Sequence, residues 1–467
     1  MDPSEALRES YDALPYERLV HRFTHPDRVA VAARLRGFEA PAVRAARVLE
    51  LGCASGDNLV GMAYGLPGAS FAGIDLSARQ VEAGRRRVGG LGLANVSLRE
   101  GDLCSLDGSW GRFDYVVAHG VLSWVPGPVR RRLWEVCRER LAPGGVAFVS
   151  WNALPGWRFR GLVREVLLAG AAPGHGPSER ARLARERLAL VAASVAEPGS
   201  PWGRYLAERA AEIERESDAD LLHDCLEVEN TPFAFREVVD AAREAGLDYL
   251  GDAQEAFVPE ARPTPELRAA LDGLASEVER EELLDVLRER TFRQGLFVRA
   301  GELPRARPGT AGVVAALHAG APPAPQGTEE EADAGLAAVL GALREAWPAT
   351  LPVAEILGRP GAGGLAEGLL WLQRSGLVEL RTEPLACGPA SSPRPRASAL
   401  ARVQAAEGLR VTSLRHRNVL LDEVAAEVLV LLDGARTPAE IAVERGIPCP
   451  VVEAVIARFR EDSLLEA

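Results

Sequence analysis

The residues best placed to do chemistry lie between Arg47 and Leu59, RVLELGCASGDNL, where a short apolar run leads into a turn that contains Gly52 and Gly56. A second apolar run, Ser70–Ile74, is followed directly by Asp75. Glycines let a backbone approach a ligand closely, and a carboxylate at the end of the next strand can accept hydrogen bonds from both ribose hydroxyls. The spacing therefore predicts a site for a nucleoside, and we expect an adenosyl ligand.

The turn also narrows the choice of adenosyl ligand. It reads GCASG, which is not the dinucleotide pattern GxGxxG, and the chain contains no GxxxxGK[ST] phosphate loop. It resembles motif I of the class I S-adenosylmethionine (SAM) methyltransferases, E/D-x-G-x-x-x-G, with Glu50 as the acidic residue. The resemblance implies that Asp102 in the later segment EGDL binds the adenine amino group and that the Leu103 amide binds a ring nitrogen.

Alternating strand and helix signals predict the elements that position these residues. Asp57 is expected to cap the first helix of the sheet domain. Between residues 158 and 228 the chain is rich in Ala, Leu, Arg and Glu, which predicts a helical insertion. The expected strands of a seven-stranded sheet, the last of them antiparallel, are Arg47–Leu51, Ser70–Ile74, a strand ending at Glu100, Phe113–His119, Leu141–Ser150, residues 247–253 and Thr291–Arg299.

The predicted fold is therefore α/β, a Rossmann-like methyltransferase sheet with a mostly helical, winged-helix-like C-terminal domain. Pro, Ala and Gly mark a linker between the two parts. The predicted segments are an N-terminal arm or lid (1–45), a catalytic domain (46–300) with its insertion at 158–228, the linker (301–327) and the C-terminal domain (328–467).

Composition excludes several classes of protein. The net charge of −12 argues against a general nucleic-acid binder, because phosphate contacts need a clustered cationic surface. The six cysteines contain no CxxC pair, so neither a disulfide scaffold nor a zinc site is indicated, and we expect no metal. Neither a signal peptide nor an apolar run of membrane-spanning length is visible, so we expect a cytoplasmic protein without a membrane span.

Candidate residues for the methyl acceptor follow the fourth and fifth strands, at the sheet edge where open α/β folds bind ligands. His119 is expected either to contact the cofactor or act as a base, or else to be a hydrogen-bonded turn residue. Trp124, Trp151 and Trp157 would form an apolar slot for an amine or, alternatively, pack between domains. Asn152 offers an amide that could orient an acceptor nitrogen.

These segments together resemble the bacterial SAM-dependent methyltransferases that carry a methyltransferase regulatory domain, a group that includes protein-lysine methyltransferases of outer-membrane proteins. The resemblance rests mainly on YDALPYE (11–17), THPDR (24–28), RVLELGCASGDN (47–58), FAGIDLSARQ (71–80), FDYVVAHGVLSWVP (113–126) and LAPGGVAFVSWNALPGW (141–157). It implies a SAM site at Gly52, Gly56, Asn58, Asp75, Leu76, Gln80, Asp102, Leu103 and His119. Tyr11, Glu50 and Cys53 are further candidates for the cofactor site, and His119, Trp124, Asn152 and Tyr16 are the candidates for catalytic roles.

The chain departs from this family at positions that bear on the acceptor. Trp151 stands where a tyrosine is usual, and Gly295 where a threonine is usual. If that tyrosine orients the acceptor amine, the departure predicts a different substrate. The polar group His223, Asp224, Glu227 and Glu229 either attracts a cationic lysine or is a helix terminus with solvated carboxylates.

The leading prediction is a SAM-dependent methyltransferase that acts on lysine side chains of a polypeptide substrate. The alternatives are a methyltransferase for a small molecule or biosynthetic intermediate, and a catalytically silent SAM-binding or peptide-binding regulator. The insertion and the C-terminal domain favour a large substrate, but they could equally form an interface between copies of the chain.

Overall fold

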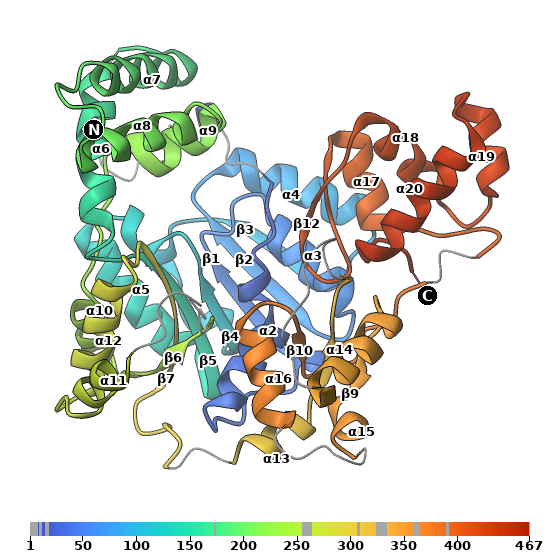
Figure 1. Cartoon of the computed structure of the whole chain (residues 1–467), viewed down its shortest axis with the longest axis horizontal. Helices are drawn as coiled ribbons and strands as arrows, with labels where there is room; N and C mark the ends of the chain where they lie inside the picture. The colour runs from blue at the N-terminus through green and yellow to red at the C-terminus, as the bar shows by residue number, and fades with distance from the viewer. Residues whose placement is uncertain are drawn as a thin grey trace.

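The computed structural model describes residues 8, 12–14, 18–171, 174–254, 264–305, 309–323, 334–358, 365–388 and 392–466. A seven-stranded sheet lies at its centre, in the order β3-β2-β1-β4-β5-β7-β6 (Figure 1). The first five strands run parallel, and β7 runs antiparallel to both β5 and β6. The strands are β1 (Arg47–Leu51), β2 (Ser70–Asp75), β3 (Val96–Glu100), β4 (Phe113–Ala118), β5 (Leu141–Asn152), β6 (Leu247–Asp252) and β7 (Phe292–Arg299).

Helices cover both faces of this sheet. Successive side chains of each buried strand point to opposite faces, so the strands contribute to two separate hydrophobic cores. On one face, Leu49 and Val149 pack with α5 (Gly127–Arg140) and α10 (Phe235–Glu244). On the other face, Val48 and Phe148 pack with α2 (Pro26–Leu35), α3 (Asp57–Gly65) and α4 (Ala78–Gly90). The carboxyl ends of the parallel strands remain open to form the site.

A helical cap follows β5 and returns to the sheet before β6, as the sequence predicted. It has its own buried core, which includes Val163, Leu188, Leu206 and Leu222. The cap elements are α6 (Trp157–Gly170), α7 (Pro177–Ala193), α8 (Pro201–Ile213), α9 (Asp218–Leu221) and the π-helix η6 (Leu222–Leu226). In Figure 1 the cap stands beside the open edge of the sheet, across from the C-terminal helices.

The C-terminal part has two hydrophobic cores instead of the one expected. The first surrounds a three-stranded sheet, and the second contains the winged-helix segment with its two-stranded sheet. The first part holds α13 (Thr310–Ala315), β8 (His318–Gly320), α14 (Ala334–Ala346), β9 (Leu351–Pro352), α15 (Val353–Leu357), α16 (Leu365–Arg374) and β10 (Glu379–Arg381). The second holds α17 (Ala399–Glu407), β11 (Arg410–Thr412), β12 (Asn418–Leu420), α18 (Glu423–Leu431), α19 (Pro438–Arg445) and α20 (Cys449–Glu461).

This arrangement corrects the linker boundary. The segment predicted as linker, 301–327, contains α13 and β8, and β8 is the central strand of the three-stranded sheet. Buried Val314, Leu317 and Ala319 hold these elements in the first C-terminal core, which outweighs the turn-forming composition around them. Within the described ranges, every helix is too short or too polar to cross a membrane.

Candidate functional site

The turn after β1 is shaped by two glycines with left-handed backbone. At Gly52 (φ +71°), a Cβ would lie 2.7 Å from a Val121 methyl group, and at Gly56 (φ +70°) one would lie 2.7 Å from Leu98. Both positions therefore require glycine. Gly56 is the N-cap residue of α3, so the expectation that Asp57 caps this helix is wrong. Asp57 is the first helical residue, and its carboxylate pairs with Arg87 at 2.7 Å.

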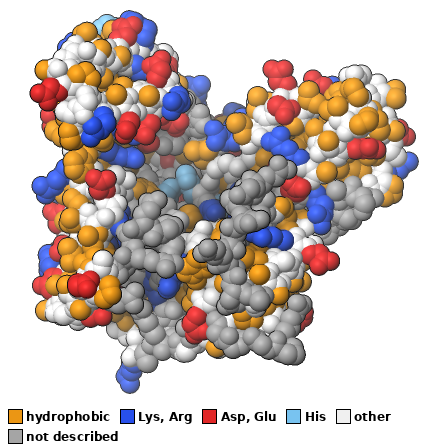
Figure 2. All heavy atoms as spheres, viewed as in Figure 1, with side chains coloured by type: hydrophobic (Ala, Val, Ile, Leu, Met, Phe, Trp, Pro, Cys, Tyr) orange, Lys and Arg blue, Asp and Glu red, His pale blue; other side chains and the backbone are white. Residues whose placement is uncertain are grey.

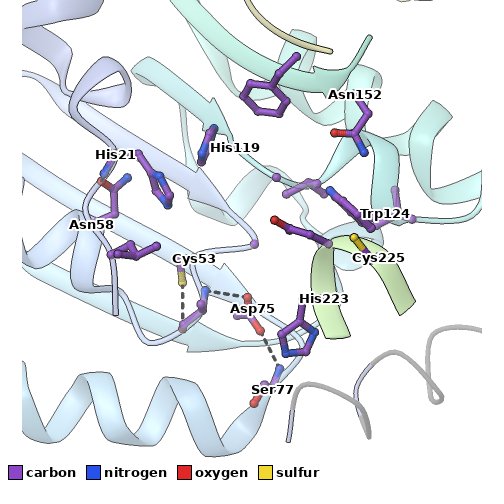
Figure 3. A pocket seen from close by; sticks show the side chains of 18 of the residues that line it. His21, Cys53, Asn58, Asp75, Ser77, His119, Trp124, Asn152, His223 and Cys225 are labelled. Carbon is purple, nitrogen blue, oxygen red and sulfur yellow. Dashed lines mark hydrogen bonds between the residues drawn. The ribbon is translucent and has the colours of Figure 1, made fainter. Parts of the chain in front are cut away.

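Asp75 ends β2 beside this turn. One of its oxygens accepts a hydrogen bond from the Ala54 N–H at 2.8 Å, and the other accepts from the Ser77 N–H at 2.9 Å (Figure 3). Burial raises the pKa of Asp75, against the effect of these two donors. Each carboxylate oxygen keeps a second lone pair, so the group can hold the turn and accept two hydroxyl donors at the same time.

Glu50 and Asn58 form a pair of buried, hydrogen-bonded side chains that also line the site. The Asn58 amide donates to Glu50 Oε1 at 2.7 Å and to Thr24 Oγ1 at 2.9 Å. Glu50 Oε2 is buried and has no hydrogen-bond partner among the described residues. Burial raises the pKa of Glu50 to about 8. A cationic ligand group would satisfy this unpartnered oxygen.

His119 follows β4 and lies beside His21, with ring centroids 4.0 Å apart. Its pKa lies well below the usual value because of burial first and the neighbouring His21 second. The ring is therefore neutral at physiological pH. Its Nδ1 atom has no partner among the described residues, so His119 can exchange a hydrogen bond with a ligand but does not supply a positive charge.

Trp124 and Asn152 line the side of the cavity at which the sequence predicts the methyl acceptor. The Asn152 backbone N–H donates to Ser123 Oγ at 2.9 Å, and its side-chain amide donates to Asn230 Oδ1 at 3.1 Å. This second bond directs the Asn152 carbonyl oxygen into the cavity, where Figure 3 shows it above Trp124. Asn152 is 4% exposed, so its orientation is fixed by packing as well as by these bonds.

One continuous cavity of about 430 Å³ joins these groups. Figure 2 shows this side of the molecule hollowed between the cap and the C-terminal lobe. The cap lines this cavity with Trp157, Arg160, Arg164 and Cys225 among other side chains. The predicted site residues that line the cavity are Glu50, Gly52, Cys53, Asn58, Asp75, Leu76, Gln80, Leu103, His119, Trp124 and Asn152.

Other candidates are placed differently. Tyr11 and Tyr16 lie outside the described residues. Gly56 shapes the turn, but it is not one of the residues that line the cavity. Asp102 lies between two lining residues but is not one itself, and its carboxylate caps the next turn by accepting from the Cys104 N–H at 2.8 Å. The binding roles of these residues remain predictions.

The expectation that Trp151 joins an apolar slot is wrong. Its side chain is 1% exposed and packs in the core against Phe297. A Cβ on Gly295 would lie 2.9 Å from the Trp151 ring, so the glycine makes room for the larger indole. The same Cβ would lie 2.9 Å from the Phe297 ring, so both departures from the family lie in one packed cluster of the core.

The four polar residues that precede β6 do not form one cluster at the site; they are His223, Asp224, Glu227 and Glu229. His223 Nδ1 lies 3.0 Å from Glu227 Oε1 and its Nε2 lies 2.6 Å from the Leu14 carbonyl oxygen, and both side chains are buried. Glu229 pairs with Arg130 at 3.2 Å. His223 and Asp224 line the cavity, whereas Glu227 and Glu229 serve the surrounding structure.

Several lining residues escaped the sequence analysis. The arm contributes Arg18, Leu19 and His21, and the cap contributes Arg160, Arg209 and Glu216 among others. Their only sequence signal was the position of the arm and insertion next to the sheet edge. Nothing local marked the individual side chains, because they reach the site through long-range packing.

Three family models match successive parts of the chain. They are described as a methyltransferase domain (residues 49–147), a predicted methyltransferase regulatory domain (217–299) and a PKMT C-terminal winged helix domain (393–444). An uncharacterized protein of Rickettsia prowazekii, RP028, is 32% identical over 241 residues, which cover 52% of this chain and 96% of that protein. The chain belongs to the class I SAM-dependent methyltransferases with a regulatory domain and a PKMT-type winged helix domain.

Two further likenesses bear on the extent of the fold. The chain matches RP789 of the same organism at 34% identity over 287 residues, 62% of this chain but only 52% of that protein. PKMT2 from Rickettsia typhi has a TM-score of 0.83 at 24% identity, covering 97% of this chain and 100% of that one. It has also been solved in complex with AdoHcy. This likeness shows that the whole arrangement of domains is shared.

The residues present fit SAM, the cofactor of this family. Gly52 lines the cavity at a position where Val121 leaves no room for a side chain, and Asp75 has free lone pairs beside this turn. The buried, unpartnered Oε2 of Glu50 suits the amino group of a methionyl moiety. The catalytic domain therefore has one group suited to the nucleoside end of the expected ligand, Asp75, and one suited to its amino group, Glu50.

Proposed function

We propose that the protein transfers the methyl group of SAM to the ε-amino group of lysine in a polypeptide substrate. The observation that carries the proposal is the single cavity that runs from Asp75 and Glu50 to Trp124 and Asn152 beneath the cap. The winged-helix family and the fold shared with PKMT2 support the same choice, since PKMT denotes protein lysine methyltransferase.

When bound, SAM supplies an electrophilic methyl group on a sulfonium sulfur. Asp75 would hold the ribose, and Glu50 would pair with the amino group. A lysine stem would lie against Trp124, whose ring faces the cavity from the turn after β4. The Asn152 carbonyl oxygen would accept a hydrogen bond from the amine, which orients the nitrogen lone pair toward the methyl group.

The acceptor must also arrive as a neutral amine. An ammonium group that enters a cavity closed by the cap loses hydration, which lowers its pKa and favours loss of its proton to solvent. Neutral His119 adds no positive charge that would repel the ammonium form, so desolvation has to favour this loss without it. This chain thus contributes to catalysis by orienting the acceptor amine and by removing its hydration. We expect the protein to act in the cytoplasm.

The test incubates the purified protein with methyl-labelled SAM and an extract of its source cells. Label in protease-sensitive material that hydrolyses to methyl-lysine would support the proposal, and Asp75→Ala should abolish it. Label confined to small molecules would instead indicate a methyltransferase for a biosynthetic intermediate. Tight SAM binding without any label would indicate a regulator.

A further inference from the structure

A turn of the second C-terminal core reaches into the catalytic domain. In the turn between β11 and β12, His416 has a left-handed backbone (φ +56°) and is 3% exposed. Its Nε2 lies 2.8 Å from the side-chain carbonyl oxygen of Asn58 on α3. Because that oxygen can only accept, Nε2 carries the proton and donates.

Asn58 is the junction through which this contact acts. Its carbonyl oxygen also accepts from the His21 N–H at 2.9 Å, and its amide donates to Glu50 Oε1 at 2.7 Å. Both His21 and Glu50 line the cavity. The orientation of the Glu50 carboxylate therefore depends on an amide that the C-terminal domain helps to hold.

The turn itself is held on both sides of His416. Arg415 and Arg417 pair with Glu379 of β10 at 3.0 and 2.8 Å. Burial alone would raise the pKa of Glu379, but the surrounding guanidinium groups hold it well below its usual range, so the cluster stays ionised. Asn418 exchanges two hydrogen bonds, of 3.0 and 2.9 Å, with the backbone of Val20 in the arm.

Close packing leaves His416 little room to move. A Cβ at Gly61, one turn along α3 from Asn58, would lie 2.9 Å from His416 Nδ1 and 3.0 Å from its Cε1. The glycine thus permits the approach that brings Nε2 to Asn58.

We propose that His416 is a positioning residue for the cofactor site, so that the winged-helix domain determines SAM affinity through Asn58 and Glu50. The domain would then be an integral part of the cofactor site as well as a candidate substrate-binding module. This inference concerns cofactor binding and holds whatever the methyl acceptor is.

The test measures the affinity of the full chain for S-adenosylhomocysteine by isothermal titration calorimetry, together with the thermal unfolding midpoint. His416→Leu keeps apolar volume but removes the donor, and we expect about 3- to 10-fold weaker binding. His416→Gln can donate from a similar place and should bind within about twofold of wild type. Both variants strain the left-handed backbone alike, so their difference isolates the hydrogen bond.

A second pair of variants perturbs the contact from the other side. Gly61→Ala must displace the His416 ring, and we expect it to weaken binding by about the same factor although alanine favours the helix. Gly65→Ala, on the same helix with nothing within 4 Å of the added Cβ, should leave binding unchanged.

Unchanged affinity in Gly61→Ala and His416→Leu, with only a lower unfolding midpoint, would overturn the proposal and leave His416 a packing residue. Equal losses in His416→Leu and His416→Gln would also overturn it. If His416→Leu does not fold, the comparison of Gly61→Ala with Gly65→Ala decides the question.

Discussion

Replacing Glu50 by glutamine should make the stability of the ligand-free protein much less dependent on pH. Glu50 is 4% exposed, and burial raises its pKa to about 8. The amide keeps an oxygen that can accept from Asn58, so the variant removes the buried charge without removing that contact.

The magnitude follows from the distance between the two pKa values. Between the usual 4.5 and about 8, the folded carboxyl group retains a proton that the unfolded chain has lost. The favourable contribution of the neutral form is therefore fully present below pH 4.5 and disappears as the pH rises toward 8. At 1.36 kcal/mol per unit, the wild-type protein loses about 3 kcal/mol of stability by pH 7 and about 4 kcal/mol by pH 8.

The assay compares thermal unfolding midpoints of the ligand-free wild type and Glu50→Gln at several pH values from 5 to 8.5. We expect the unfolding midpoint of the variant to rise relative to that of the wild type by about 4 °C between the extremes of pH. Any cost of burying the new amide hydrogens is independent of pH and shifts the whole curve without changing its slope. Glu39→Gln, at an exposed position, is the control and should show no such trend. A gap between Glu50→Gln and wild type that stays constant over this range would refute the reasoning.

Three further predictions test other parts of the site. Asp75→Ala should weaken S-adenosylhomocysteine binding by about 100-fold or more in calorimetry, because it removes hydrogen bonds to a charged acceptor and releases the turn, while circular dichroism shows a retained fold. Asn230→Ala should lower the kcat of methyl transfer about tenfold by freeing the Asn152 amide, and Asn230→Asp, which still accepts from it, should restore most of that loss. Gly295→Ala should lower the free energy of unfolding by about 1–3 kcal/mol, and Trp151→Phe should relieve much of that cost in the double variant.

The sequence predicted the turn and the strand end that shape the expected cofactor site, because their signals are local. A turn that needs glycine at Gly52 and an acidic residue after the next strand follow from the backbone of a few residues. The seven strands, the antiparallel last strand and the helical insertion were also predicted correctly, since apolar runs and turn residues mark each element.

The parts that were not predicted depend on contacts between distant segments. His416 lies 358 residues from Asn58 in the chain, and neither residue type announces the pairing. The two C-terminal cores could not be separated by composition, because a linker rich in Pro and Ala also supplied Val314 and Ala319 to the first core. Contacts between distant segments therefore determine where the first C-terminal core begins and which residues hold Asn58 beside the cofactor site.

The error at Trp151 has a more specific cause. Trp151 and Asn152 are neighbours at the end of β5, and the sequence analysis assigned both to the acceptor site because both follow the buried part of the strand. Successive side chains of a strand point to opposite faces, so only one of the two could enter the cavity. Asn152 does, and Trp151 packs into the core beside Gly295. Strand alternation applied to β5 would have placed both residues correctly, and it explains how a departure next to the site leaves the acceptor amide in position.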